Sequence, residues 1–535
     1  MNVTFVALGS EQLSLSLLSA VLRREGHSTS LAFHPALFAD RYFLDVPPLA
    51  ALFDRTARVV DEVVAGAPDL VAFSVLTPTY QWALDVARAV KRRLDVPVIF
   101  GGVHPSAEPE VCLENACVDY VCVGEGEEAI LRLCDALATG HARPARPIPN
   151  LWWRDGALLV RGAAAPFIQD LDALPPFDKE LWDGPIRVAD NYLTMTSRGC
   201  PYRCAFCFNS FFASLPGRGG GRYVRQRSID HAMSELVAAK SRFAIRRVDF
   251  EDDIFTVEKS WIRDFLIEYR RDIGVPFQCL VHPRYVDAEV ARWLREAGCE
   301  HVQMGVQSAD EEYKRTQLLR MEKEAHLEAA LGALAAAGVP TKLDHMLGLP
   351  GEPPSAQDKA RALYARFPPR RIQTFWLTWL PGIELLREAL ASGRLSTADH
   401  DAIRRGETRL FHSRTARSDD ERQSFYRRYE VLFRLMPLLP RRAREAVRAE
   451  HVPDLPAPLA TAFGLGLELV NLAAHRDSEA ENYARHYLHT MAWQARELVG
   501  AQVEPRWLPP YPPSYGRAYF PGSRAKRRRH GAPQK

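Results

Sequence analysis

The sequence predicts an α/β protein with a doubly wound parallel sheet at the N-terminus, a partial (β/α)6 barrel in the middle and a helical region at the C-terminus. Two observations predict this arrangement. Short apolar segments typical of buried strands alternate with segments of helical apolar spacing over the first 140 residues. A second series of the same kind runs from Tyr192 to Gly393, and only helical spacing follows it.

The first domain is expected over residues 1–140. Its strands are predicted at Asn2–Leu8, Thr29–Phe33, Leu70–Leu76, Val98–Phe100 and Tyr120–Val123. Helices are predicted between them at Leu13–Glu25, Leu49–Ala65, Tyr80–Leu94 and Glu127–Ala138. Sheets of this kind bind ligands at the carboxyl ends of their strands.

A connector rich in Pro, Gly and Ala is expected over residues 141–190, with a short strand-like piece at Trp152-Trp153. The barrel is expected over 191–393, and its six strands are predicted at Tyr192–Thr196, Arg247–Glu251, Phe277–Val281, His301–Val306, Thr341–Leu347 and Gln373–Leu377. Residues 394–502 are predicted to be helical. Residues 503–535 are rich in Pro and Arg and are expected to lack regular structure.

Composition excludes several classes of protein. An apolar fraction of 47% with 25% charged residues is that of a globular chain, not a disordered one. No apolar run is long enough to span a bilayer, so no transmembrane segment is expected. The N-terminus has no basic start before an apolar core, which predicts a cytoplasmic protein.

The net charge of +3 hides an uneven distribution. The last twelve residues carry six positive charges, on Arg524, Lys526, Arg527, Arg528, Arg529 and Lys535, so the rest of the chain is slightly acidic. By charge the body is therefore not a nucleic-acid binder. The tail is interpreted as a solvated end, with contact to nucleic acid or an acidic membrane surface as the alternative.

Three of the nine cysteines form a motif. Six are scattered through apolar or helical patterns and are interpreted as buried thiols: Cys112, Cys117, Cys122, Cys134, Cys279 and Cys299. Cys200, Cys204 and Cys207 instead follow the first predicted barrel strand, at spacings of four and three residues. Zinc sites usually take four ligands in Cys-x-x-Cys pairs, and no second pair lies nearby. Three thiolates on an iron–sulfur cubane would leave one iron open. A zinc site completed by a distant ligand, or three unrelated thiols, are the alternatives.

The segment Cys200-Pro-Tyr-Arg-Cys204-Ala-Phe-Cys207 resembles the motif of the radical S-adenosylmethionine (SAM) enzymes. The resemblance implies a [4Fe-4S] cluster on the three cysteines, with SAM chelated at the open iron and cleaved to a 5′-deoxyadenosyl radical. It also implies that Phe206 packs near the adenine of SAM.

Later segments resemble the SAM-binding strand ends of the same family. Glu251 and Asp252 follow the second barrel strand, where the family faces the SAM amine. Gln307 and Ser308 follow the fourth strand, near the ribose or carboxylate, although Gln307 replaces the commoner Glu. The loops Gly348-Leu-Pro-Gly-Glu352 and Leu380-Pro-Gly-Ile-Glu384 follow the fifth and sixth strands. Taken singly, each loop is also an ordinary turn.

The first domain resembles the corrinoid-binding domains that occur fused to radical SAM barrels. The matching segments are Ser74-Val-Leu76-Thr77, Gly101-Gly102-Val-His104-Pro-Ser106 and Gly124-Glu125-Gly126-Glu127. Glycine there lets a ligand approach the backbone closely. The resemblance implies that Ser74, Leu76, Thr77, Gly101, Gly102, His104, Gly124, Glu125 and Gly126 contact cobalamin.

One departure from the corrinoid proteins concerns the lower cobalt ligand. The Asp-x-His-x-x-Gly motif is absent, and Gly9-Ser-Glu-Gln-Leu-Ser14 stands in its place. The fold therefore either binds cobalamin without that histidine or holds no corrinoid. His104 is interpreted as a loop or tail contact, with cobalt ligation as the alternative.

By resemblance, the expected enzyme is a cobalamin-dependent radical SAM methyltransferase acting on an unactivated carbon of a small-molecule or lipid metabolite. It would take electrons from an external one-electron reductant of the flavodoxin or ferredoxin type. One alternative is a non-methylating enzyme of the same cofactors that forms or contracts rings or couples carbons, and another is a non-catalytic corrinoid or iron–sulfur protein. The sequence assigns no acid–base residue, and it places Trp376, Trp379 and the C-terminal helices at the substrate pocket.

Overall fold

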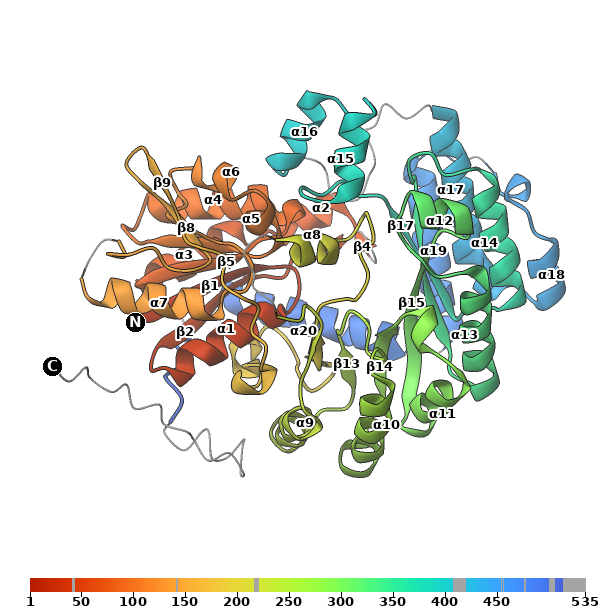
Figure 1. Ribbon diagram of the computed structural model, residues 1–535, viewed down its shortest axis with the longest axis horizontal. Coiled ribbons are helices and arrows are strands. Elements are labelled where there is room, and N and C mark those ends of the chain that lie inside the picture. Colours follow the sequence, from red (N-terminus) through yellow and green to blue (C-terminus); the bar gives the residue numbers. More distant parts are fainter. Residues whose placement is uncertain are drawn as a thin grey trace.

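The computed structural model describes residues 1–40, 44–140, 143–215, 221–407, 420–453, 455, 457–475, 478–499 and 506–512. The first sheet (red to orange) and the second sheet (green to cyan) belong to two bodies that lie side by side (Figure 1). Helices α8 (Phe208–Ser214) and α20 (Ser478–Val499) lie between them in this view.

The first sheet has seven strands in the order β2-β1-β5-β6-β7-β8-β9. They are β1 (Asn2–Leu8), β2 (Ser28–His34), β5 (Leu70–Ser74), β6 (Val98–Gly101), β7 (Tyr120–Cys122), β8 (Leu151–Asp155) and β9 (Leu158–Arg161). The first five pair in parallel, as predicted. A small separate ribbon joins β3 (Ala39–Asp40) to β4 (Leu44–Asp45).

Helices cover both faces of this sheet. Leu15 of α1 (Leu13–Arg24) and Leu133 of α7 (Glu127–Ala138) pack in one core cluster. The other face holds α3 (Thr56–Gly66), α4 (Tyr80–Lys91) and α6 (Pro109–Leu113). The predicted doubly wound arrangement is therefore confirmed.

Two local predictions for the first body are wrong. The helix predicted at Leu49–Ala65 is two helices, α2 (Pro47–Leu52) and α3. Between them the Asp54 carboxylate accepts from the Thr56 N–H and the Thr56 hydroxyl at the first residue of α3. The strand-like piece placed in the connector belongs to the first sheet. Its strand β8 pairs antiparallel with β7, and β9 pairs with β8.

The second sheet has six parallel strands in chain order, as the partial barrel requires. They are β10 (Tyr192–Thr194), β13 (Val248–Phe250), β14 (Phe277–Val281), β15 (Cys299–Gln307), β16 (Thr341–Leu347) and β17 (Arg371–Trp376). The intervening helices are α9 (Ile229–Phe243), α10 (Lys259–Glu268), α11 (Ala288–Glu296), α12 (Glu311–Thr316), α13 (Glu324–Ala337) and α14 (Ser355–Arg366). Val248, Phe250 and Val302 point to the helices and join the largest core cluster.

The C-terminal region is helical, as predicted. Its helices are α15 (Glu384–Ala391), α16 (Thr397–Arg404), α17 (Asp420–Leu435), α18 (Arg441–Ala446), α19 (Ala457–Ala474) and α20. Several of them join the two bodies. Arg404 of α16 forms an ion pair with Glu108 at 2.8 Å, and the Gln494 amide of α20 donates to the Phe53 carbonyl.

Part of the segment predicted to lack order packs on the first body. Leu508 forms a bridge with Thr29, and the Arg23 guanidinium lies 4.1 Å from the centre of the Tyr511 ring. The basic tail from Arg524 to Lys535 lies outside the described residues. Among the helices that are described, none combines the length and the apolar character needed to cross a membrane.

Candidate functional site

A cavity of about 520 Å³ lies where the first sheet faces the barrel mouth. Its walls come from four places: the strand ends of the first sheet, helix α1, the connector at Phe167 and Phe177, and the loops that follow the first two barrel strands. Most of the predicted corrinoid contacts line it, namely Ser74, Leu76, Gly101, Gly102, Gly124, Glu125 and Gly126. The cavity thus lies at the carboxyl ends of these strands, where ligands were predicted to bind.

Gly102 is required by the backbone around it. Its φ is +100°, and a Cβ atom built there would lie 2.9 Å from the Val75 nitrogen and 3.0 Å from the Val75 oxygen. The Ser106 hydroxyl donates to the Gly102 carbonyl and accepts from the Gly124 N–H, so it ties two glycine loops together. Leu76 remains 48% exposed and presents an apolar side chain to the cavity.

His104 and Thr77 lie beneath the loop and do not line the cavity. The His104 ring is fully buried, its Nδ1 lies 3.2 Å from the Thr77 hydroxyl, and it packs 4.2 Å from the centre of the Tyr80 ring. Burial lowers the pKa of His104 to about 3, so the ring is neutral. No histidine is among the described residues that line the cavity. In this structure His104 supports the loop, as we interpreted it from the sequence.

The loop that replaces the Asp-x-His-x-x-Gly motif also reaches the cavity. Ser10, Gln12 and Ser14 line it, and the Ser14 hydroxyl lies 3.2 Å from the Ser74 hydroxyl. Glu11 turns away and forms a buried ion pair with Lys179 of the connector. This loop therefore contributes hydroxyl and amide side chains to the cavity, together with the apolar Leu13.

The cysteine loop begins directly after β10 and lies next to the cavity. Cys204 is 8% exposed, whereas Cys200 and Cys207 are half-buried. The Ser210 hydroxyl lies within hydrogen-bond distance of the carbonyl oxygens of both Cys204 and Cys207, at 2.9 and 2.6 Å, and its one proton serves either of them. Burial raises the pKa of the Cys200 thiol to about 12 and that of Cys207 to about 11, and the neighbouring thiols of the motif contribute to both shifts.

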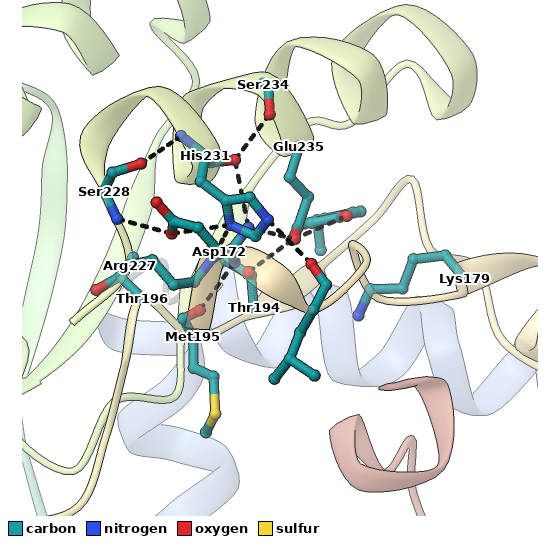
Figure 2. Close-up of polar contacts among 12 residues, drawn as sticks. Asp172, Lys179, Thr194, Met195, Thr196, Arg227, Ser228, His231, Ser234 and Glu235 are labelled. Carbon is teal, nitrogen blue, oxygen red and sulfur yellow. Dashed lines mark hydrogen bonds and ion pairs between the residues drawn. The ribbon is translucent and has the colours of Figure 1, made fainter. Parts of the chain in front are cut away.

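A scaffold of buried charges holds the strand that carries this loop (Figure 2). Glu235 of α9 accepts from the hydroxyls of Tyr192 and Thr194 on β10, and from Arg227 at 2.9 Å. Arg227 also donates to the Met195 carbonyl and to Nδ1 of His231. Burial disfavours the charged carboxylate of Glu235, yet Arg227 and these hydrogen bonds hold its pKa below the ordinary value. The cysteine loop therefore follows a strand, β10, that is held in place by hydrogen bonds to Glu235 of α9.

The predicted SAM contacts separate into two groups. Phe206 is partly buried against the cluster that contains Leu349 and Trp379. Gln307 ends β15 with φ +64°, beside a register shift, and its side chain is partly exposed. Glu251 is exposed at its surface, but desolvation by the surrounding protein and the neighbouring Asp249 raise its pKa to about 8.

Asp252 and Ser308 are closed to a ligand, contrary to the prediction. Asp252 is fully buried and accepts from the Thr196 N–H, the Thr196 hydroxyl and the Ser197 hydroxyl. It therefore ties the second barrel strand to the start of the cysteine loop. Ser308 is also fully buried, and its hydroxyl accepts from the Asp310 N–H.

The two predicted pocket tryptophans are also packing residues. Trp379 is 5% exposed inside a core cluster, and the Trp376 indole donates to Glu430 of α17. Neither lines the cavity between the two bodies.

Sequence reasoning missed the residues that form the wall between the cysteine loop and the cavity. The Tyr223 hydroxyl donates to the Asn209 oxygen at 2.6 Å, and the Asn209 amide donates to Asp253 at 2.6 Å. Tyr223 and Asp253 line the cavity, and Asn209 lies two residues after Cys207. The available signal was that Asp253 directly follows the predicted contacts Glu251 and Asp252; Asp253 lines the cavity, whereas Asp252 does not.

The donor set fits the two implied cofactors. The three cysteines form no disulfide and lie in one loop, which fits ligands of an iron–sulfur cluster. Within the described ranges, no group of three or more His, Cys, Asp or Glu side chains is arranged to hold a single metal ion. On the other side, Gly102 leaves open a cradle that a Cβ atom would fill.

Comparison with known families matches two regions of the chain. Residues 6–133 match the B12 binding domain, and residues 194–362 match the Radical SAM superfamily. The first match runs from within β1 to within α7, and the second begins at the last residue of β10 and contains the cysteine loop and strands β13 to β16.

Individual relatives share these regions. An uncharacterised methyltransferase of Pyrococcus horikoshii is 29% identical over 308 residues, which cover 56% of this chain and 61% of the relative. The anaerobic magnesium-protoporphyrin IX monomethyl ester cyclase of Cereibacter sphaeroides is 24% identical over 60% of this chain and 52% of its own. This chain therefore spans between half and two thirds of the length of these relatives.

One solved structure matches almost the whole fold. The cobalamin-dependent S-adenosylmethionine radical enzyme OxsB, with aqua-cobalamin and S-adenosylmethionine bound, superposes with a TM-score of 0.62 at 14% identity. The match covers 92% of this chain and 83% of OxsB. The arrangement of the two bodies and the C-terminal helices is thus a known fold. The chain thus matches a B12 binding domain followed by a Radical SAM domain.

Proposed function

We propose that this protein is a cobalamin-dependent radical SAM methyltransferase that transfers a methyl group to an unactivated carbon of a small-molecule or lipid metabolite. One observation carries the proposal: a mostly apolar cavity is lined on one side by the glycine loops of the B12-binding domain and on the other by Gly199 and Phe212, which flank the cysteine loop of the barrel. Two cofactors held on these loops would face the same space. The methyltransferase among the relatives supports this assignment.

Each part of the chain has a defined task in this proposal. Cys200, Cys204 and Cys207 would hold the cluster, and the loops at Ser74, Gly101 and Gly102 would hold the corrinoid. When bound, the cluster and SAM supply a radical that removes hydrogen from carbon, and the corrinoid supplies the methyl group. Phe167, Phe177 and Phe212 line the cavity and keep water from the reacting atoms.

In this proposal Asn209, Tyr223 and Asp253, which lie between the cysteine loop and the cavity, orient one another and transfer no proton. Asn209 holds Tyr223 and Asp253 in one hydrogen-bonded row along the boundary of the cavity. Asp252 and Glu235 fix the strand ends from which the cysteine loop emerges. Such preorganisation keeps two reactive centres and a substrate in contact range.

Electrons would come from an external reductant of the flavodoxin or ferredoxin type. The methyl transfer would take place in the cytoplasm, where the nine free thiols of this chain remain reduced.

The test follows the fate of SAM in the anaerobic, reconstituted protein with a chemical reductant. With cobalamin present, we expect S-adenosylhomocysteine to form before any substrate is added, because the methyl group of SAM must first be taken up. We also expect 5′-deoxyadenosine, and the Cys204→Ala variant should not produce it. Absence of S-adenosylhomocysteine in cobalamin-loaded protein contradicts methyl transfer.

A second function is favoured by the cyclase among the relatives. It keeps both cofactors but makes a ring or a carbon–carbon bond. Formation of 5′-deoxyadenosine without S-adenosylhomocysteine is the result that selects it.

A further inference from the structure

Four charged side chains form a closed ion cluster on one wall of the cavity. The Arg198 guanidinium donates to Glu125 at 2.8 Å and to Glu127 at 2.5 Å, and Arg225 donates to the same Glu125 oxygen at 2.7 Å. The second Glu125 oxygen accepts from the Ile168 N–H at 2.7 Å. All four side chains line the cavity.

These residues come from the loops that would hold the two cofactors. Glu125 and Glu127 alternate with Gly124 and Gly126 in the B12-binding domain. Arg198 stands two residues before Cys200, on the short strand β11 (Ser197–Arg198). Arg225 lies opposite it on β12 (Arg225–Gln226). The cluster therefore joins the corrinoid loop directly to the base of the cysteine loop.

The connector is drawn into the same cluster. Arg225 donates to the Ile168 carbonyl at 2.9 Å, and its guanidinium lies 5.0 Å from the centre of the Phe167 ring. Ile168 thus gives its N–H to Glu125 and its carbonyl to Arg225, so the connector cannot shift without breaking both contacts.

The burial of this cluster separates it from ordinary surface ion pairs. The side chains of Arg225 and Glu127 are 5% and 9% exposed, and those of Glu125 and Arg198 are 16% and 19% exposed. By contrast, the adjacent Glu128 pairs with Arg132 within one helix, and both side chains are more than half exposed. Although burial favours the neutral acid, Arg198 and Arg225 hold the pKa of Glu125 below the ordinary value. The Glu125 carboxylate is therefore bound by the two arginines.

We propose that Glu125 and Glu127, together with Arg198 and Arg225, are positioning residues that set the separation between the corrinoid loop and the cysteine loop. This inference rests on the proposed function, because it assumes that both loops carry their cofactors. The four residues join the corrinoid loop to the cysteine loop through charge-assisted hydrogen bonds, which hold the two loops at a fixed separation. Loss of the Glu125 carboxylate leaves the buried Arg225 without its carboxylate partner and Arg198 with Glu127 alone, which lets the loops separate.

The test measures the distance between the cofactors in the full-length protein. The protein is reconstituted with iron and sulfide, loaded with cobalamin and reduced until both the cluster and cob(II)alamin are paramagnetic. The magnetic interaction between the two spins is then recorded by electron paramagnetic resonance for the wild type, Glu125→Gln, Glu127→Gln and Glu128→Gln. Glu128→Gln is the matched control, since it removes a neighbouring carboxylate that points to solvent.

We expect the wild type and Glu128→Gln to give the same interaction. Glu125→Gln should weaken and broaden it, and should reduce cobalamin affinity about tenfold, a typical effect of removing a residue that orients a ligand-binding group. Circular dichroism checks that each variant is folded. If Glu125→Gln does not fold, Glu127→Gln decides, because it removes one partner of Arg198 and leaves the Glu125–Arg225 contact in place.

An interaction and an affinity unchanged in folded Glu125→Gln and Glu127→Gln overturn the proposal, and so does a wild type with no interaction at all. These spectra need no substrate and no methyl transfer. If S-adenosylhomocysteine fails to form while the two spins interact in the wild type, the proposed function fails and the positioning role stands.

Discussion

The substitution Gly102→Ala tests whether the backbone of the corrinoid loop is as constrained as its geometry indicates. Gly102 has φ +100°, a conformation in which a residue other than Gly costs about 1–3 kcal/mol. The added Cβ atom would also lie 2.9 Å from the Val75 nitrogen, so the backbone of one loop must move. Overpacking of this kind costs about 1–3 kcal/mol more.

Gly26→Ala is the matched control within the same domain. Gly26 has a similar φ of +95°, but a Cβ atom built there has no neighbour within 4 Å. Gly26→Ala therefore has the free-energy cost of the positive φ but no steric overlap of the added Cβ atom. Since one kcal/mol shifts the melting temperature of a domain of this size by about 2–4 °C, the two variants should be distinguishable by calorimetry.

Cobalamin binding is the second measurement on this pair. Gly102 lines the cavity, so displacement of its loop should lower the affinity for cobalamin in Gly102→Ala. Gly26 does not line the cavity, and Gly26→Ala should bind cobalamin as the wild type does. Equal melting temperatures and equal affinities in the two variants would refute the reasoning.

Three further predictions concern other parts of the site. Cys204→Ala should lose the cluster and all cleavage of SAM while it retains cobalamin, as seen in the visible spectrum; retention of the iron signal would contradict the assignment. Glu235→Gln should lower the free energy of unfolding by about 3–5 kcal/mol, because it leaves Arg227 buried without its carboxylate; a denaturant midpoint equal to that of the wild type would exclude this role. Burial lowers the pKa of His104 from 6.5 to about 3, so the unfolded chain binds an extra proton below pH 6.5. The stability contributed by this neutral ring is complete above pH 6.5 and is lost as the pH falls, by about 1 kcal/mol at pH 5.5. His104→Gln should therefore lose less stability than the wild type between pH 7.5 and 5.5, and equal losses would show that the ring does not titrate as described.

The sequence predicts most of the fold because the signals are local. The period of apolar residues changes between strand and helix within a few residues, and it places α7, β14 and β16 at their observed bounds. Strands β8 and β9 escape this reasoning. Their partner β7 lies about thirty residues earlier in the chain, and the Pro- and Gly-rich surroundings resemble a linker.

The candidate site is less accessible to sequence reasoning because side-chain partners come from distant segments. Glu125 pairs with Arg198, 73 residues away, and with Arg225, 100 residues away. The motif around Glu125 predicts a ligand loop, but nothing in it reveals that two arginines occupy the carboxylate. In the same way, Asp252 and Asp253 are adjacent in sequence, yet one is buried under the cysteine loop and the other lines the cavity.

The most direct test of the central claim, that the cysteine loop and the glycine loops hold two cofactors across one cavity, is the cofactor content of the anaerobically reconstituted protein. The account predicts about four iron and four sulfide ions per chain, as one cubane requires, together with one cobalt in the same molecules. It also predicts that Cys204→Ala keeps the cobalt and loses the iron. Zinc in place of iron on the cysteines, or iron without any cobalt, would contradict it.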